Sequence, residues 1–387
     1  MSVSGHLRKR KTKDNQVHYQ AVVEAAYDRS TGKRKRIYKT VKGTKKQAEH
    51  YLREMIAEIE NNTYVNESNV TVKEWMNTWV ELYLKDKSPT TVAGYKKQID
   101  SYIIPHFGNV PLQSLTTLEI QRWVNGLYDC SPASNKPISA KTVRNIFLNL
   151  QAACRKAVVL EMLKKNPCDN VVLRKSESRV VNPYSADEVK ELVNAVKGTD
   201  LEVPMLIDLS LGLRRGELLA LQWNDIDFEK NCVHIRHNIV LDKDRNIVTK
   251  KPKSKSGDRV IALSPKLSVI LKQARVKYLE NKLKAGSKFQ DNNLVVCKPD
   301  GSPYNPDSFS SKFRRFIKKN KLRPIRLHDI RHTNCTQLLM NGVDMKTMQE
   351  RLGHSDYSIT ANTYSHVLPE VDRHASEVAD SFLFGNG

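Results

Sequence analysis

The sequence predicts a multidomain protein that is mainly α-helical with small β parts. Its 387 residues, at about 150 residues per domain, correspond to two or three domains. Apolar residues recur at helical spacing through most of the chain, whereas strand-like runs are confined to two short stretches. The expected order is a small β-sheet with a helix, then an all-α domain, then a mixed α/β domain.

The charge of the chain points to a polyanionic partner. The 64 Lys and Arg exceed the 42 Asp and Glu by 22, a surplus that repels itself unless an anion neutralises it. Nucleic acid is therefore the expected partner. No run of about 18 apolar residues exists, which excludes a membrane-spanning class, and the basic amino terminus has no apolar stretch behind it. We expect a cytoplasmic protein that acts on DNA.

The amino-terminal module is expected to span residues 1–62. Its first 46 residues carry a net charge of +11, half of the total surplus. Residues 17–23 and 36–41 have strand-like patterns with a polar, glycine-containing turn near 30–33, and a helix is expected to follow. A basic sheet backed by a helix suits a DNA-binding module. The alternative is a solvated basic arm with loose affinity for phosphate.

A polar linker at residues 63–70 precedes a domain at 71–173 that is expected to be all helical. Thr71 and Glu74 form a capping box, and an apolar stripe follows it at helical spacing. The helices expected here begin at Thr71 and at Ser88, the latter ending at Pro105 and Gly108, and span 118–127 and 141–160.

A charged linker at residues 174–183 separates this domain from a mixed α/β domain at 184–369. Strand-like runs cluster between residues 232 and 263, and the periodicity is helical again from residue 307 onward. The tail at 370–387 contains apolar residues at roughly helical spacing. We expect this tail to dock either on a neighbouring subunit or on its own.

The cysteines do not predict a metal site or a disulfide framework. The six cysteines are widely separated and include no Cys-x-x-Cys pair. They are expected to be reduced and mostly buried thiols.

Two clusters of cations suggest chemistry on a phosphate. Residues 212–218 place Arg214 and Arg215 at a glycine-bounded turn before a helix. Further along, His328 and Arg331 are three positions apart, so they share one face of a helix and can bind one phosphate. Taken singly, such residues are more often solvated or paired with an acid.

A histidine and a tyrosine follow these cations. His354 comes directly after Gly353, which is expected to end a helix, and Tyr364 stands ten residues later in the run Tyr-Ser-His-Val. A phenol together with several cationic donors suggests attack of tyrosine on a phosphodiester, with charge stabilisation in place of a metal. The simpler alternative is a histidine that caps a helix and a tyrosine in the core.

The order of these motifs resembles the tyrosine recombinase (phage integrase) family. Arg-x-x-Gly-Glu-Leu, a lysine in a β-hairpin, His-x-x-Arg, Leu-Gly-His and Tyr-Ser-His-Val follow one another as they do in that family. The resemblance is strongest from residue 184 to 367 and weakest before residue 62. It implies an arm-type DNA-binding module, a core-binding domain and a catalytic domain of the tyrosine recombinase type, similar to integrases of temperate phages and conjugative transposons.

The resemblance implies a catalytic role for each matching residue. Glu217 takes the family's acidic position and is expected to orient the first arginine. Four lysines compete for the hairpin position, namely Lys250, Lys251, Lys253 and Lys255. Lys255 fits best and Lys253 second, and Tyr357 is the rival nucleophile. The implied catalytic set is Arg214, Lys255, His328, Arg331, His354 and the nucleophile Tyr364.

The implied activity is site-specific DNA recombination through a 3′-phosphotyrosyl intermediate, which integrates and excises a mobile element without ATP. No metal and no nucleotide cofactor are implied. The expected partners are double-stranded DNA at core and arm sites, three further copies of the chain in a tetrameric synapse, an excision factor and a DNA-bending protein. A recombinase that resolves dimers, a relaxing topoisomerase and a non-catalytic DNA-binding regulator remain as alternatives.

Overall fold

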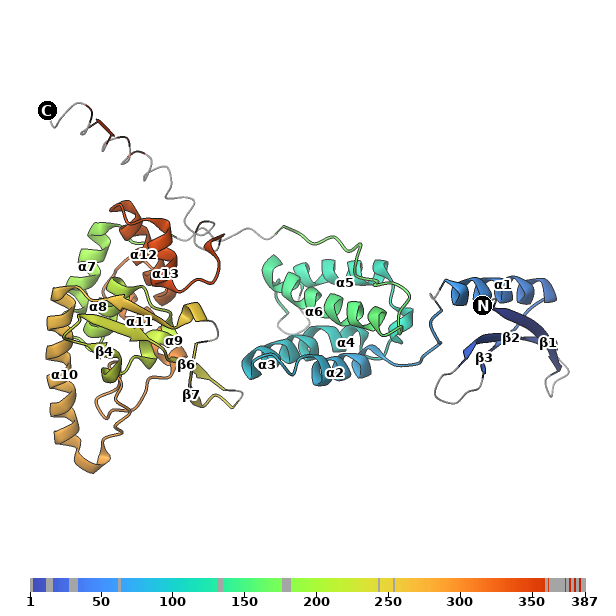
Figure 1. Ribbon diagram of the computed structural model, residues 1–387, viewed down its shortest axis with the longest axis horizontal. Helices are drawn as coiled ribbons and strands as arrows, with labels where there is room; N and C mark the ends of the chain where they lie inside the picture. The colour runs from blue at the N-terminus through green and yellow to red at the C-terminus, as the bar shows by residue number, and fades with distance from the viewer. Residues whose placement is uncertain are drawn as a thin grey trace. The chain divides into compact units, whose positions relative to one another are not determined.

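The computed structural model divides the chain into two compact units, Met1–Ser178 and Arg179–Gly387 (Figure 1). The residues described are 3–11, 17–27, 34–61, 64–130, 135–175, 182–242, 244–252, 255–358, 361, 373, 376, 379–380 and 383. The expected turn at 30–33, Lys253, Tyr364 and most of the tail at 370–387 lie outside the described residues. The predicted domain boundaries remain predictions.

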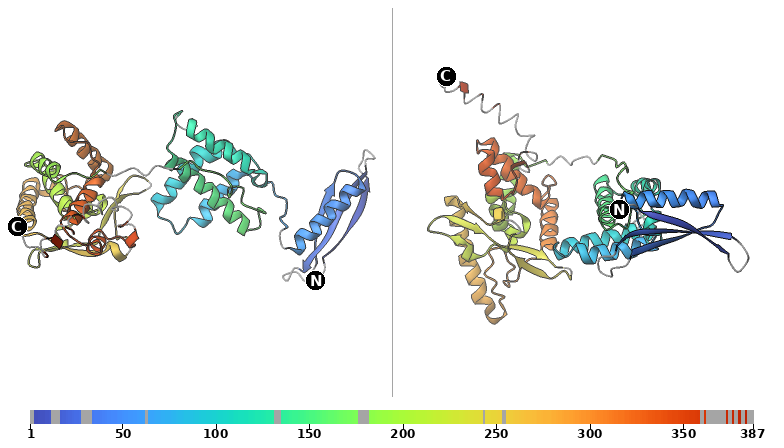
Figure 2. Two further views of the ribbon diagram at one scale, coloured as in Figure 1. Left: turned by 90° about the horizontal axis from the view of Figure 1, so that it is seen from above. Right: turned by 45° about the vertical axis from the view of Figure 1, so that its right-hand side comes forward.

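The first unit begins with an antiparallel three-stranded sheet in the order β1-β2-β3, followed by a helix. Helix α1 lies along one face of this sheet in Figures 1 and 2. Ala21, Val23, Ala48 and Met55 are buried in this module. The elements are β1 (Ser4–Lys11), β2 (Val17–Tyr27), β3 (Arg34–Val41) and α1 (Lys45–Glu60).

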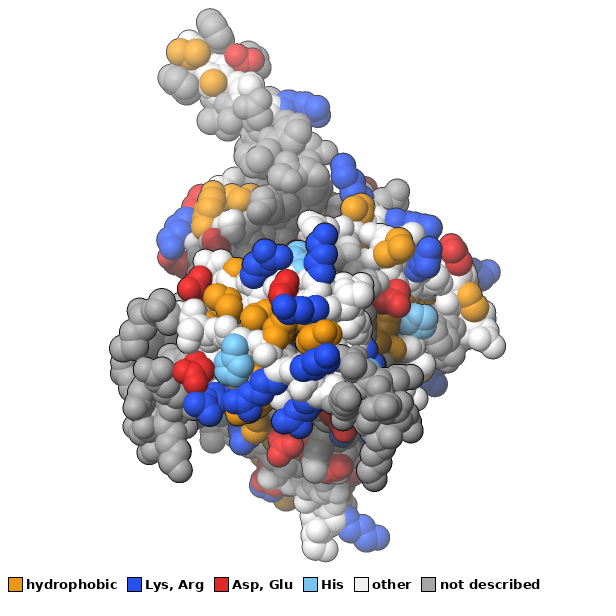
Figure 3. Space-filling model, turned by 90° about the vertical axis from the view of Figure 1, so that its right-hand side faces the viewer, with side chains coloured by type: hydrophobic (Ala, Val, Ile, Leu, Met, Phe, Trp, Pro, Cys, Tyr) orange, Lys and Arg blue, Asp and Glu red, His pale blue; other side chains and the backbone are white. Residues whose placement is uncertain are grey.

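Strand β1 was not expected from the sequence. Leu7 is its one large apolar residue, so the segment has the composition of a basic arm. It becomes a strand because it pairs along its whole length with the more apolar β2, with Leu7 opposite Ala21. Successive side chains of a strand point to opposite faces of the sheet. The exposed Arg8 and Arg10 therefore carry their charge on the face opposite Leu7. Lys and Arg side chains gather on the face of the molecule in Figure 3.

The helices expected at residues 71–173 are present, and they enclose a core of aliphatic and aromatic side chains that includes Trp75, Ile120 and Leu150. Capping boxes start the helices that follow Thr71 and Thr116. The elements are α2 (Val72–Tyr83), α3 (Pro89–Gln98), a π-helical turn (Ile99–Ile103), α4 (Ile104–Phe107), a 3₁₀ turn (Leu112–Ser114), α5 (Thr117–Asp129) and α6 (Ala140–Val159).

Pro105 does not end a helix, contrary to the expectation. The π-helical turn Ile99–Ile103 changes the hydrogen-bond spacing, so that the N–H of Ile104 donates to the carbonyl of Ile99. Pro105 then stands in the first turn of α4, where a missing N–H costs little. The helical path therefore continues to Gly108.

The second unit combines two small β structures with seven α-helices among its described residues. Strands β4 (Ile226–Asp227), β5 (Cys232–Ile235) and β8 (Arg259–Ala262) form one sheet, and β6 (Asn238–Leu241) pairs with β7 (Ile247–Lys250). The helices are α7 (Ala186–Val196), α8 (Glu202–Leu211), α9 (Arg215–Ala220), α10 (Pro265–Ala285), α11 (Pro306–Lys319), α12 (Leu327–Met340) and α13 (Met345–Leu352). Short 3₁₀ turns occur at Trp223–Asp225, Lys255–Gly257 and Gly286–Lys288.

Helix α12 is central to the second unit. It contacts α8, α11 and α13, and its Ile330 is fully buried beside residues from these elements such as Phe309. The packing of α8 against α12 holds the end of α8 close to the first turns of α12. Helix α9 follows α8 directly, so its start lies there too. The observed architecture, mainly α with small β parts, confirms the expected fold class.

All six cysteines are free thiols, and Cys154, Cys168 and Cys335 are buried. Within the described part of the chain, none of the helices is both long enough and apolar enough to cross a membrane.

Candidate functional site

The first candidate arginine stands at a sharp turn between two helices. Gly212 ends α8 with a left-handed backbone (φ 61°), and Arg214 is the residue that precedes α9. A side chain at position 212 would place its Cβ 2.6 Å from Oδ1 of Asn334, so this turn requires glycine. The tight turn brings Arg214 close to α12 and α13.

Arg214 is held by a buried carboxylate. Its Nη1 donates to Oε1 of Glu217 at 2.8 Å, and its backbone N–H donates to Oε2 of the same side chain at 3.0 Å. Nη2 of Arg214 donates to the carbonyl of Gly353 at 2.9 Å. The Arg214 side chain remains 40% exposed, whereas that of Glu217 is 4% exposed. Glu217 therefore fixes an arginine that still reaches the surface.

A second arginine shares the same carboxylate. Nη2 of Arg259, on strand β8, donates to Oε2 of Glu217 at 2.9 Å, and its Nε donates to the carbonyl of Arg351 at 2.6 Å. Burial opposes ionisation of Glu217, but the hydrogen bonds and charges of Arg259 and Arg214 outweigh it and lower the pKa of Glu217. Glu217 is thus an anion that joins the start of α9 to strand β8. Sequence reasoning missed Arg259.

Arg331 is buried and bound by main-chain carbonyls. Only 2% of the residue is exposed. Nη1 donates to the carbonyl of Gly212 at 2.7 Å, and Nη2 donates to the carbonyl of Leu352 at 2.7 Å and to Nε2 of His354 at 2.9 Å. This single guanidinium therefore connects the end of α8, the end of α13 and His354.

The contact with Arg331 also determines the tautomer of His354. Burial, followed by the charges of Arg331 and Arg214, lowers the pKa of His354 to about 4. The ring is neutral at pH 7, and an arginine can only donate, so Nε2 of His354 accepts and its proton lies on Nδ1. His354 thus presents an N–H donor without carrying a charge.

His328 is exposed on the first turn of α12. Shielding of its ring by the protein and the charge of Arg331 lower the pKa of His328, which keeps the imidazole neutral and able to accept a proton. Its ring lies 5.1 Å from that of His332, edge to face. Burial, followed by the neighbouring His328, lowers the pKa of His332 to about 4.

Asp208 is a buried acid beside this group for which the sequence predicted no role. It lies on α8, is 2% exposed, and its Oδ1 has no hydrogen-bond partner among the described residues. Burial raises the pKa of Asp208 to about 8, against the opposing charge of Arg331. This carboxyl lies beneath the turn that carries Arg214.

The lysine and tyrosine candidates are only partly visible. Lys250 ends β7, and Lys251 follows it in an exposed position. The backbone of Lys255 begins the 3₁₀ turn Lys255–Gly257, but its side chain is outside the described structure, as are Lys253 and Tyr364. The rival Tyr357 is 50% exposed. The structure bonds Arg214 directly to Glu217 and Arg331 directly to His354, and Arg214 also bonds the carbonyl of Gly353, next to His354.

Gly353 provides a test of this architecture. Its φ is 66°, and a Cβ there would lie 2.5 Å from the carbonyl oxygen of Ser256 and 3.0 Å from Nη1 of Arg259. We expect Gly353→Ala to destabilise the protein by about 2 kcal/mol or more and to reduce activity by displacing His354. Chemical denaturation and an activity assay measure the two effects.

Gly342→Ala is the matched control for that substitution. Gly342 also has a positive φ, 83°, but nothing lies within 4 Å of its expected Cβ. Gly342→Ala should therefore lose only the stability that the unfavourable backbone conformation costs, and it should retain activity. Equal losses in the two variants would show that the close contacts at Gly353 do not matter.

Comparison with known proteins places this chain in a known family. Residues 184–370 match the phage integrase family, and residues 71–128 match the phage integrase N-terminal SAM-like domain. A "Tyrosine recombinase XerC-like" protein of Caldanaerobacter subterraneus subsp. tengcongensis is 31% identical over 88% of this chain and 90% of its own.

Two solved structures share the fold. The Tn1549 transposon integrase in complex with a circular intermediate DNA is 22% identical, with a TM-score of 0.68, over 80% of this chain and 99% of its own. A lambda integrase tetramer bound to a Holliday junction is 18% identical, with a TM-score of 0.58, over 92% of this chain and 94% of its own.

These family matches define a DNA strand-transfer enzyme, and the chain belongs to the phage integrase family. It is a tyrosine site-specific recombinase, an enzyme of DNA integration and excision. The family resemblance expected from the sequence is confirmed.

Proposed function

We propose that Arg214, Arg331 and His354 bind the scissile phosphate and that Tyr364 attacks it. The observation that carries this proposal is the hydrogen-bonded group in which Arg331 joins Gly212, Leu352 and His354. Each terminal nitrogen of Arg214 carries two hydrogens, of which its contacts with Glu217 and Gly353 use one each. The second hydrogens can bind a non-bridging phosphate oxygen.

The charge of this group suits the reaction. A pentacovalent phosphate gathers negative charge on its non-bridging oxygens, and fixed donors stabilise that charge without reorganising. Arg214 and Arg331 supply two positive charges, and neutral His354 supplies a third donor through Nδ1. Glu217 and Asp208 touch no phosphate in this proposal, and Glu217 is a positioning residue.

The proton transfers follow from the state of the side chains. The phenol of free tyrosine has a pKa of about 10, so attack at pH 7 requires a base. Neutral His328 accepts that proton while the oxygen of Tyr364 bonds to phosphorus and the bond to the 5′ oxygen breaks. Lys255 protonates the departing 5′ oxygen. The resulting 3′-phosphotyrosyl bond retains the energy needed for the next strand to join without ATP.

We further propose that the enzyme acts as a tetramer on two duplexes of double-stranded DNA, as the lambda integrase does on a Holliday junction. The helical domain and the second unit bind core sites, and the exposed basic face of β1 binds arm sites. An excision factor and a DNA-bending protein assist the enzyme, and the tail at 370–387 docks either on a neighbouring subunit or on its own. No metal or nucleotide takes part in this proposal.

Covalent trapping tests the proposed chemistry. Wild-type protein and Tyr364→Phe are each mixed with nicked duplexes from the ends of the encoding element, in EDTA, and separated on a denaturing gel. We expect a protein–DNA adduct with wild type and none with Tyr364→Phe, while both bind the DNA, because only the phenol can form the phosphodiester. Tyr357→Phe is the matched control and should form the adduct.

The other outcomes identify the alternatives. Binding without any adduct in either protein would support a non-catalytic regulator. If random-sequence DNA prevents adduct formation as effectively as DNA of the specific sequence does, the result would support a relaxing topoisomerase. An adduct lost in Tyr357→Phe but kept in Tyr364→Phe would reassign the nucleophile.

A further inference from the structure

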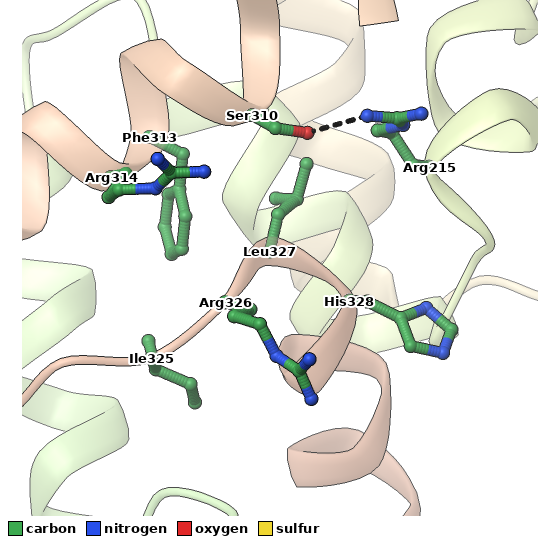
Figure 4. Close-up of a pocket in the computed structure, with 8 residues that line it drawn as sticks. All are labelled: Arg215, Ser310, Phe313, Arg314, Ile325, Arg326, Leu327 and His328. Carbon is green, nitrogen blue, oxygen red and sulfur yellow. Dashed lines mark hydrogen bonds between the residues drawn. The ribbon is translucent and has the colours of Figure 1, made fainter. Parts of the chain in front are cut away.

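A pocket beside His328 contains an unusual number of arginines. It encloses about 370 Å³ and is lined by residues of α9, α11 and the start of α12. In Figure 4, Arg215, Arg314 and Arg326 lie on different sides of Leu327, and His328 lies at the edge of the pocket. None of the lining residues is an acid.

The three arginines differ in how they are held. Arg215 donates through Nη1 to Ser310 Oγ at 2.9 Å and to Asp307 Oδ1 at 3.2 Å. Arg326 forms a two-point contact with Asp329, at 3.1 and 3.2 Å. The side chain of Arg314 is exposed and has no hydrogen bond or ion pair with any other residue that the structure describes. The pocket therefore has two fixed cations and one available cation.

Its floor is apolar. Phe313, Ile325 and Leu327 are buried and line the pocket beneath the guanidinium groups. An apolar wall reduces screening by water, so a bound anion interacts more strongly with these cations than it would at an open surface. The combination suits a phosphodiester, whose oxygens are anionic and whose deoxyribose presents C–H groups.

We propose that this pocket binds the DNA backbone phosphate next to the scissile phosphate on the cleaved strand, with Arg314 as its main ligand. This inference rests on the proposed function, because His328 belongs both to the pocket and to the proposed catalytic group. A DNA strand that is bound at the catalytic group and runs past His328 would place its next phosphate in this pocket. Binding there fixes which phosphodiester stands before Tyr364, and so the position of the cut.

Replacing Arg314 tests the pocket, with its neighbour as a matched control. Arg315 is also exposed on α11 but does not line the pocket, so Arg315→Ala removes the same charge from the same helix. We expect Arg314→Ala to weaken binding of the specific duplex about tenfold and to reduce the slope of log affinity against log salt by about one. Arg315→Ala should change both much less, and circular dichroism verifies that both variants fold.

Neutral phosphates locate the contact. A methylphosphonate is placed at each position that flanks the mapped cut, and binding is measured for all three proteins. One flanking position should weaken wild type and Arg315→Ala about tenfold, yet have no further effect on Arg314→Ala. Additive losses at every position, or equal losses in the two variants, would overturn the pocket assignment.

The remaining outcomes are distinct. Sensitivity to an abasic site beside the cut, without sensitivity to methylphosphonates, would show that the pocket holds a base and would also overturn the proposal. If wild type forms an adduct while the pocket tests fail, the proposed function stands without this inference. If wild type binds but forms no adduct, the proposed function fails on its own.

Discussion

Arg331→Lys is expected to slow covalent adduct formation by about 100-fold or more at saturating DNA. The planar guanidinium bonds the carbonyls of Gly212 and Leu352 and the ring of His354 at once. An ammonium keeps the charge but cannot reach three such acceptors and a phosphate in one geometry. Loss of a single donor of this kind typically costs 10² to 10³ in rate. Single-turnover kinetics on a nicked duplex measure the effect.

Arg323→Lys controls for the structural part of that change. Arg323 also binds main-chain carbonyls, those of Asn182 and Pro183, and pairs with Glu188, but none of these contacts belongs to the proposed site. Its substitution should lower the melting temperature and leave the adduct rate nearly unchanged. Comparable rate losses in both variants would assign the effect of Arg331→Lys to folding.

Glu217→Gln is expected to destabilise the protein by about 3 kcal/mol and to reduce activity. The substitution keeps the shape of the side chain but leaves Arg259, 8% exposed, and Arg214 without their anion. Removing one partner of a buried ion pair is costly because the other charge stays buried. Glu188→Gln is the control: Glu188 closes the capping box that Ser185 begins, as the third residue of its helix, but its pair with Arg323 is more exposed and should contribute about 1 kcal/mol or less.

The difference in stability between wild type and Glu217→Gln should also depend on pH. The folded protein lowers the pKa of Glu217, so its contribution is present above the ordinary glutamate pKa and disappears as the pH falls through the folded value. Wild type should exceed Glu217→Gln in stability at pH 7, and the two should converge below about pH 4. Denaturation between pH 7 and pH 3 measures the difference. A constant difference would show that the charge of Glu217 is not what stabilises it.

The helices could be predicted because their signals are local. Capping boxes at Thr71 and Ser185 and apolar stripes behind them mark where helices begin and which face is buried. Strand β1 could not be predicted, because its own residues carry almost no apolar pattern and its conformation depends on pairing with β2. The continuation of the helical path through Pro105 depends on a π-helical turn, for which the sequence has no clear signal.

The candidate site shows the same division. Arg214, His328, Arg331 and His354 stand in short motifs with fixed spacing, so their family resemblance was visible in the sequence. Arg259 lies 42 residues from Glu217, in a segment where several lysines drew attention, and only the folded chain brings the two together. That contact has no counterpart in any local pattern.

The acceptors that orient the site's arginines are largely main-chain carbonyls, namely those of Gly212, Arg351, Leu352 and Gly353. Every amino acid supplies such an oxygen, so changes of residue type at Arg351 and Leu352 leave the acceptors in place, whereas Gly212 and Gly353 are also needed for their left-handed backbone. An insertion or deletion of one residue in either turn would move the acceptors of that turn away from the arginines. We therefore expect these two turns to tolerate substitutions at their non-glycine positions but not changes in length.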